Sequence, residues 1–243
     1  MQLIPNSIIA IIILGLCIVA PAAAGSFEDG ATAYKRGDYA TALNLFRPLA
    51  EQDDPRAQNN LGFMYAEGQG VPQDYTQAVK WLRLAADQGN ARAQTSLGAM
   101  YVEGHGVRQN YPEAVKWYRL AADQGLAMAQ VNLGAMYLNG HGVPRDYAEA
   151  VKWYHLAAEQ GYADAQFALG VFYEDGLGVT KDVVRALMWY SVAAARYPVA
   201  DTAMRDGAST FRDQLSVKLT PEQIAEAQKL AREWKPTARA NSQ

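Results

Sequence analysis

One stretch of twelve residues occurs twice in this chain with few changes, and this repetition constrains the fold more than any other feature. SLGAMYVEGHGV runs from Ser96 to Val107, and NLGAMYLNGHGV runs from Asn132 to Val143. The 36-residue spacing extends to four related copies, which begin at Ala57, Ala93, Ala129 and Ala165. A duplicated active-site loop and a structural repeat would both produce such a pair. A constant period across four copies favours the structural repeat, in which each unit packs on its neighbours.

Each copy predicts a first helix with one apolar face. In the first copy, spacings of four, seven and eight residues place four side chains on that face: Ala57, Leu61, Met64 and Tyr65. A glycine recurs in the middle of the helix, at Gly62, Gly98, Gly134 and Gly170. Because glycine in a helix costs about 1 kcal/mol relative to alanine, its recurrence predicts the close approach of a partner helix.

A Gly-x-Gly pair ends the first helix, and a second helix follows. In the first copy the pair is Gly68 and Gly70, where glycine supplies the left-handed cap and the turn. A phosphate-binding loop would need a preceding strand and a third glycine, which this pattern lacks. Asp74 with Gln77 forms a capping-box pattern at the start of the second helix. The apolar face of that helix is predicted to hold Ala78, Trp81, Leu82 and Ala85.

The four copies share the pattern A-x-x-x-L-G-x-M-Y-x-x-G-x-G-V-x-x-D-Y-x-x-A-x-x-W-x-x-x-A-A-x-x-G. This pattern resembles the Sel-one-like repeat (SLR), a relative of the tetratricopeptide repeat (TPR), from Ala57 to about Tyr197. The resemblance implies an all-α fold, a right-handed α-solenoid of stacked helical hairpins. The fourth copy departs from the pattern, with Phe172 in place of Met, Val183 in place of Tyr and no closing glycine. That departure fits a last repeat that meets a different neighbour.

The flanking segments complete the predicted order of the chain. Phe27 to Gln52 resembles a TPR-type hairpin with a shorter loop, which would cap the N-terminal end of the stack. Thr220, Pro221 and Gln223 predict the start of a final helix that caps the other end. The expected segments are a signal peptide at 1–24, the TPR-like hairpin at 25–56, repeats at 57–92, 93–128, 129–164 and 165–199, capping helices at 200–235 and a disordered tail at 236–243.

The N-terminal segment predicts export. An unbroken apolar run, IIAIIILGLCIVA, extends from Ile8 to Ala20, and the small residues of Ala22–Ala24 form a cleavage site. We therefore expect a periplasmic or secreted protein. Met1 to Ser7 holds no Lys or Arg, so an uncleaved inner-membrane anchor is the alternative. Cys17 is the one cysteine and lies inside the apolar run, so the mature chain has no disulfide, thiol nucleophile or cysteine-bound metal.

The sequence lacks two common motifs of serine nucleophiles. It contains neither G-x-S-x-G nor S-x-x-K. His105 and His141 occupy the same repeat position and would make a metal pair, but Gln69 and Leu177 hold that position in the other copies. We interpret both as exposed turn histidines and predict no metal and no cofactor. Some cysteine-rich relatives with these repeats are labelled β-lactamases, but this chain lacks their paired cysteines. A β-lactamase-like or cell-wall-acting enzyme is the alternative to a non-enzymatic protein.

The composition gives no reason to expect nucleic acid as a partner. The formal net charge is −3, which provides no strong positive field. We therefore predict a protein or peptide partner, and a membrane association only if the signal is uncleaved. The identity of the partner and the oligomeric state are not predicted.

The binding surface is predicted from the resemblance, since first helices line the concave face in this superfamily. Function there follows positions beside the core stripe, which form a polar, an apolar and an acidic row. Side-chain amides can hold the backbone of an extended peptide, and carboxylates would favour a basic segment; the alternative is that these are solvated helix positions. The hypothesis is an adaptor, scaffold or regulator of the bacterial envelope. The candidate residues are Asn60, Phe63, Glu67, Ser96, Glu103, Asn132, Asn139 and Asp175.

Overall fold

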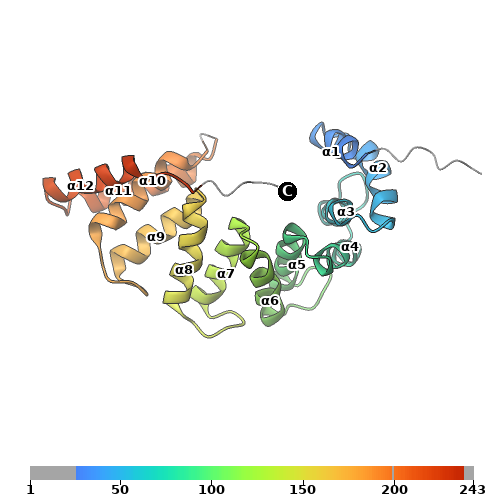
Figure 1. Ribbon diagram of the computed structural model, residues 1–243, viewed down its shortest axis with the longest axis horizontal. Helices are drawn as coiled ribbons and strands as arrows, with labels where there is room; N and C mark the ends of the chain where they lie inside the picture. The colour runs from blue at the N-terminus through green and yellow to red at the C-terminus, as the bar shows by residue number, and fades with distance from the viewer. Residues whose placement is uncertain (1–25, 199, 238–243) are drawn as a thin grey trace, which may run out of the picture.

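The computed structural model describes residues 26–198 and 200–237, which form twelve α-helices and no strand within those ranges. The helices form an open arc (Figure 1), as the predicted α-solenoid requires. Their bounds are α1 (Phe27–Lys35), α2 (Tyr39–Glu51), α3 (Pro55–Glu67), α4 (Tyr75–Asp87), α5 (Ala91–Glu103), α6 (Tyr111–Asp123), α7 (Ala127–Asn139), α8 (Tyr147–Glu159), α9 (Ala163–Asp175), α10 (Val183–Arg196), α11 (Thr202–Ser216) and α12 (Pro221–Glu233).

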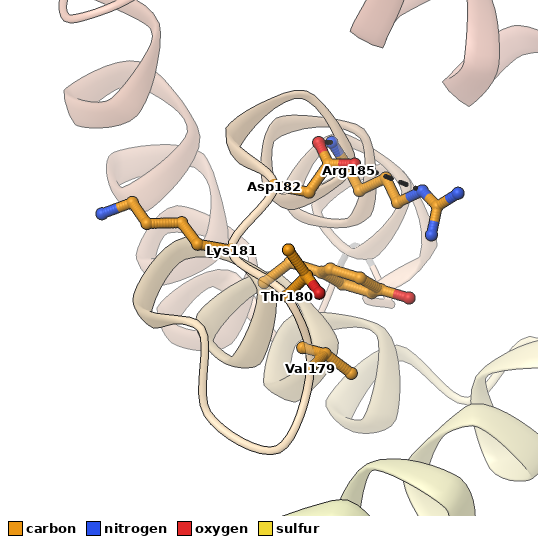
Figure 2. Close-up of a pocket in the computed structure, with 6 residues that line it drawn as sticks. Val179, Thr180, Lys181, Asp182 and Arg185 are labelled. Carbon is orange, nitrogen blue, oxygen red and sulfur yellow. Dashed lines mark hydrogen bonds and ion pairs between the residues drawn. The ribbon is translucent and has the colours of Figure 1, made fainter.

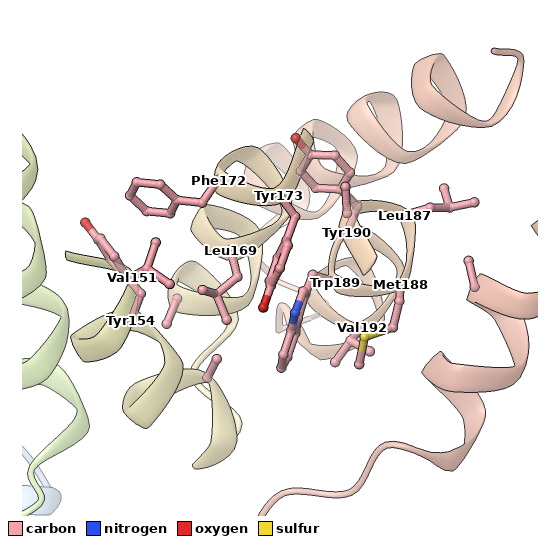
Figure 3. Close-up of a cluster of buried hydrophobic side chains, with 14 of the residues drawn as sticks. Val151, Tyr154, Leu169, Phe172, Tyr173, Leu187, Met188, Trp189, Tyr190 and Val192 are labelled. Carbon is pink, nitrogen blue, oxygen red and sulfur yellow. The ribbon is translucent and has the colours of Figure 1, made fainter. Parts of the chain in front are cut away.

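Consecutive helices pair into antiparallel hairpins, and each hairpin packs on the next. The first helices α3, α5 and α7 lie on the inner side of the arc, and α4, α6 and α8 lie on the outer side (Figure 1). Each hairpin alone would leave its apolar face in water, so stacking buries one core along the arc. The largest buried cluster lies between α8, α9 and α10, where Leu169, Tyr190 and Trp189 meet (Figure 3).

The glycine in the middle of each first helix admits a large side chain of the second helix, as predicted. A Cβ atom on Gly98 would lie 2.6 Å from the ring of Tyr118. On Gly170 it would lie 2.4 Å from the ring of Tyr190. The fully buried Tyr190 ring therefore occupies space that any other residue would fill.

The second glycine of each Gly-x-Gly pair joins one repeat to the one before it. Gly106 has φ +67°, and a Cβ atom there would lie 2.2 Å from the carbonyl oxygen of Tyr75. The ring of His105 stacks on the Tyr75 ring with centroids 4.4 Å apart. His141 stacks in the same way on Tyr111, at 4.6 Å. The duplicated twelve residues therefore belong to a joint between repeats.

Buried glutamines form a second link between repeats, which we call the amide ladder: Gln58, Gln94, Gln130 and Gln166. The Gln94 Nε2 donates to the Ala86 carbonyl at 3.1 Å, and its Oε1 accepts from Gln124 Nε2 at 2.8 Å. The ladder ends at Gln166, because Arg196 stands where the earlier repeats have the donating glutamine. Within residues 26–198 and 200–237, Gln166 Oε1 has no hydrogen-bond partner.

The last two helices both pack on α10. The start of α12 has the predicted capping box. The Thr220 hydroxyl accepts from the Gln223 backbone N–H, and the Gln223 side chain accepts from the Thr220 backbone N–H. Beyond α12 the Thr237 N–H donates to the Glu159 carbonyl at 2.8 Å, which holds residues 236–237 against the end of α8. The expected signal peptide and the rest of the expected tail, 238–243, lie outside the described residues.

The close approach at the mid-helix glycine makes a prediction for stability. Gly98→Ala would force the Tyr118 ring to move, so the free energy of unfolding should fall by about 1–3 kcal/mol. Gly207 in α11 has no atom within 4 Å of the position that a Cβ atom would take, so Gly207→Ala should raise it by about 0.5–1 kcal/mol. Urea unfolding followed by circular dichroism measures both. Equal effects of the two substitutions would contradict the packing argument.

The amide ladder makes a second prediction. Gln94→Leu removes two hydrogen bonds and leaves the Ala86 carbonyl without its side-chain donor, which should cost about 2–4 kcal/mol of unfolding free energy. Gln166→Leu removes one hydrogen bond and an already unpartnered oxygen, so it should cost about 1 kcal/mol less. Thermal and urea unfolding of the two variants compare them directly. A Gln166 variant as unstable as the Gln94 variant would show that the ladder is not a repeat-to-repeat link.

Candidate functional site

A groove of about 620 Å³ is lined in part by residues of α3, α5 and α7, the helices on the inner side of the arc (Figure 1). We call it the concave groove. It is built by α1, α3 and α5, by the turn into α7 and by the turn between α8 and α9. Residues from five successive hairpins thus meet at one surface. Its lining includes Tyr34, Asn60, Phe63, Arg92, Ser96, Leu126, Met128, Gln160 and Tyr162.

The structure brings three of the predicted site residues together. Asn60, Phe63 and Ser96 all line the concave groove. The Phe63 side chain is unusually accessible for a phenylalanine, at 43% exposure. One residue of the apolar row and two residues of the polar row therefore line the same groove.

The other five predicted residues do not line the groove. Asn132 lies half-buried on α7. The remaining four are exposed at the far ends of the first helices: Glu67, Glu103, Asn139 and Asp175. The Glu103 carboxylate lies 2.9 Å from His105 Nδ1, and Asn139 Nδ2 donates to the Ala135 carbonyl at 2.9 Å. The acidic row is consequently separate from the groove.

Arg92 is the one charged side chain among the residues that line the groove. Its counterpart one repeat earlier, Arg56, pairs with Asp54 at 2.9 Å and with Glu28 at 3.5 Å. In α5 the capping residue is Asn90, a neutral amide that accepts from the Ala93 N–H. Arg92 therefore lacks the capping carboxylate that Arg56 has, and no ion pair within 4.0 Å involves it within the described ranges.

The start of α7 lies in the groove wall without a side-chain cap. The side chains of Asp54 and Asn90 cap α3 and α5. Leu126 and Tyr162 occupy the same position before α7 and α9, and their side chains provide no capping hydrogen bond. The first N–H groups of a helix have no intrahelical acceptor and carry partial positive charge. The groove wall thus includes a helix start whose first N–H groups have no side-chain acceptor.

Two tyrosines complete the wall and remain neutral at pH 7. Burial raises the pKa of Tyr34, with the neighbouring Tyr39 adding to the effect. Burial also raises the pKa of Tyr162, followed by the Asp164 carboxylate. The Tyr34 hydroxyl donates to Gln69 Oε1 at 2.5 Å, which ties α1 to the next hairpin. Neither ring adds charge to the groove.

Sequence reasoning missed Arg92, Leu126 and Met128 as groove residues. It considered positions beside the core stripe, whereas these three lie at the starts of the first helices. A signal was present in the repeats, since the capping position reads Asp54, Asn90, Leu126 and Tyr162. A position that normally caps a helix is expected to keep Ser, Thr, Asp or Asn. Its change to Leu and Tyr indicates that the side chains there no longer cap the helix and can serve the surface instead.

A smaller cavity of about 300 Å³ lies at the turn between α9 and α10 (Figure 2). Asp182 caps α10 and pairs with Arg185 at 3.4 Å, so both charges have partners.

In the part of the chain that the structure covers, no cluster of three or more His, Cys, Asp and Glu residues is placed to bind a metal. In the same part, none of the helices has the length and apolarity to cross a membrane.

Comparison with known proteins identifies the repeats. The family model of the Sel1 repeat matches residues 24–54, 55–90, 91–126, 127–162 and 163–197. The first match covers the hairpin that we expected to be TPR-like. No curated protein matches the chain.

Several solved structures are similar to this chain. A Sel1 repeat protein from Oxalobacter formigenes is 34% identical, with a TM-score of 0.72, over 85% of this chain and 81% of that one. A Sel1 repeat protein from Klebsiella pneumoniae is 22% identical, with a TM-score of 0.51, over 78% and 91%. A protective antigen of uropathogenic Escherichia coli strains, which displays an SLR fold, is 28% identical, with a TM-score of 0.48, over 86% and 61%.

Proposed function

Because this chain belongs to the Sel1 repeat family, we propose that it is a non-enzymatic adaptor, scaffold or regulator that binds a protein segment in its concave groove. Sel1 repeat proteins generally mediate protein–protein interactions and are generally non-catalytic scaffolds. The observation that carries the proposal is the exposure of Phe63 and Met128, at 43% and 51%, inside a groove that also holds amides. Large exposed apolar side chains in a groove are typical of a binding surface.

The chemistry of the groove suits an extended peptide. Asn60 offers an amide that can donate and accept, and a peptide backbone needs both. Gln160 donates through its Nε2 to Gln130 and to the Leu156 carbonyl, so it offers only its Oε1, as an acceptor. Phe63 and Met128 offer contact area for apolar side chains, with burial contributing about 25 cal/mol per Å². Met adapts its shape to different partners, so the site would accept related segments.

A photocrosslinking experiment tests the proposed face. The photoreactive benzoylphenylalanine would replace Phe63 in the groove or Leu120 on the outer helix α6, whose side chains are 43% and 49% exposed. We expect cross-linking to a defined partner protein in cells from position 63 and not from position 120. Equal capture from both positions, or capture from position 120 alone, would contradict binding in the groove.

We further propose that the protein acts in the bacterial envelope after removal of the signal peptide. Cleavage after Ala24 would leave Gly25 as the first residue. Intact-mass measurement of the protein recovered from the envelope fraction should therefore give a chain that begins at Gly25. A mass that includes residues 1–24 would support the inner-membrane anchor instead.

A further inference from the structure

We propose that the concave groove selects peptide segments that place a carboxylate beside a large apolar side chain, and that Arg92 sets this preference. The inference rests on the proposed function, since it names the chemistry of the partner for the same groove. It reverses the expectation from the sequence, in which an acidic row favoured a basic segment. The reason for the reversal is the position of the charges in the folded chain.

The charge of the groove comes from Arg92 alone. Glu67, Glu103 and Asp175 do not line it. Arg56, by contrast, has its charge compensated by Asp54 and Glu28, and its guanidinium lies 4.3 Å from the centre of the Phe27 ring. The whole chain carries a net charge of −3, so the groove is a local exception to the sign of the molecule. A complementary partner would supply the carboxylate that Arg92 lacks.

The uncapped start of α7 adds to the same preference. Gly125, Leu126 and Ala127 line the groove wall, and Leu126 offers no cap to the first N–H groups. These groups form hydrogen bonds with anions, and the positive end of the helix dipole favours negative charge. Arg92 and this helix end act on one groove from different elements, which gives the preference two independent sources.

The apolar part of the preference comes from residues on both sides of Arg92. Phe63 lies on α3, and Met128 lies one first helix further along the stack than Arg92, on α7. A segment that pairs its carboxylate with Arg92 would therefore have apolar surface available on either side. The ion pair supplies the sign of the preference, and the apolar contacts supply most of the binding free energy.

Selection from a library of random twelve-residue peptides displayed on phage tests the proposal. The purified protein is compared with Arg92→Gln and with the matched control Arg56→Gln, each checked for wild-type unfolding. We expect the wild-type protein and the Arg56 variant to enrich Asp or Glu within two residues of Phe, Leu, Met, Trp or Tyr. The Arg92 variant should lose the acidic enrichment.

The selected peptides then permit a double-mutant cycle. Changing the carboxylate of a synthetic peptide to the amide should weaken wild-type binding about three- to ten-fold, as should Arg92→Gln. The two changes together should weaken binding no further, because they remove the same interaction. Additive effects, selected peptides without acidic enrichment, or equal behaviour of the Arg92 and Arg56 variants would overturn the inference.

A third variant separates this inference from the proposed function. Phe63→Ser should abolish peptide binding if the groove is the binding site. If the Phe63 variant loses binding but Arg92→Gln keeps the acidic enrichment of the selected peptides, the inference is overturned and the proposed function stands. Unchanged binding in the Phe63 variant, or a selection that returns no peptide with any protein, would overturn both.

Discussion

The contact between neighbouring repeats is the interaction on which the rest of the structure depends. At each joint a glycine with positive φ lies against the backbone that begins the second helix of the previous repeat, as Gly106 does against Tyr75. Backbone cannot move aside as a side chain can, so this position fixes both the residue and the distance between repeats. The amide ladder adds buried hydrogen bonds at the other end of the helices. Together these contacts set the curvature of the arc and hence the groove.

The end of the stack shows what happens when the pattern of contacts changes. Arg196 replaces the glutamine that would complete the rung at Gln166, and its guanidinium lies 4.8 Å from the centre of the Trp234 ring instead. The aromatic pair Trp189 and Trp234, with centroids 5.9 Å apart, then joins α10 to the end of α12. The divergent fourth copy in the sequence therefore exchanges a contact with another repeat for contacts with the C-terminal helix.

Much of the fold could be predicted because the same structural requirements recur in four copies of the repeat. The mid-helix glycine, the capping residues and the Gly-x-Gly turn are local requirements, so one sequence was enough to recognise them. The glutamine after the first alanine of each copy was equally visible in the sequence. Its role could not be predicted, because it depends on a partner 30 positions away, as Gln94 depends on Gln124. The groove could not be predicted in the same way, because it depends on how far apart the curvature holds α3, α5 and α7. The acidic row illustrates the difference, since its residues share a repeat position but lie outside the groove.

The most direct test of the central claim measures amide hydrogen exchange in the first turn of α7 with and without a peptide selected by the protein. The N–H groups of Ala127, Met128 and Ala129 precede the first intrahelical bond of that helix, which Gln130 donates to Leu126. Binding in the concave groove should slow the exchange of these three groups, while the side-chain-capped first turn of α12 remains unchanged. Slowed exchange on the outer helices α4, α6 and α8, with the start of α7 unaffected, would contradict the account.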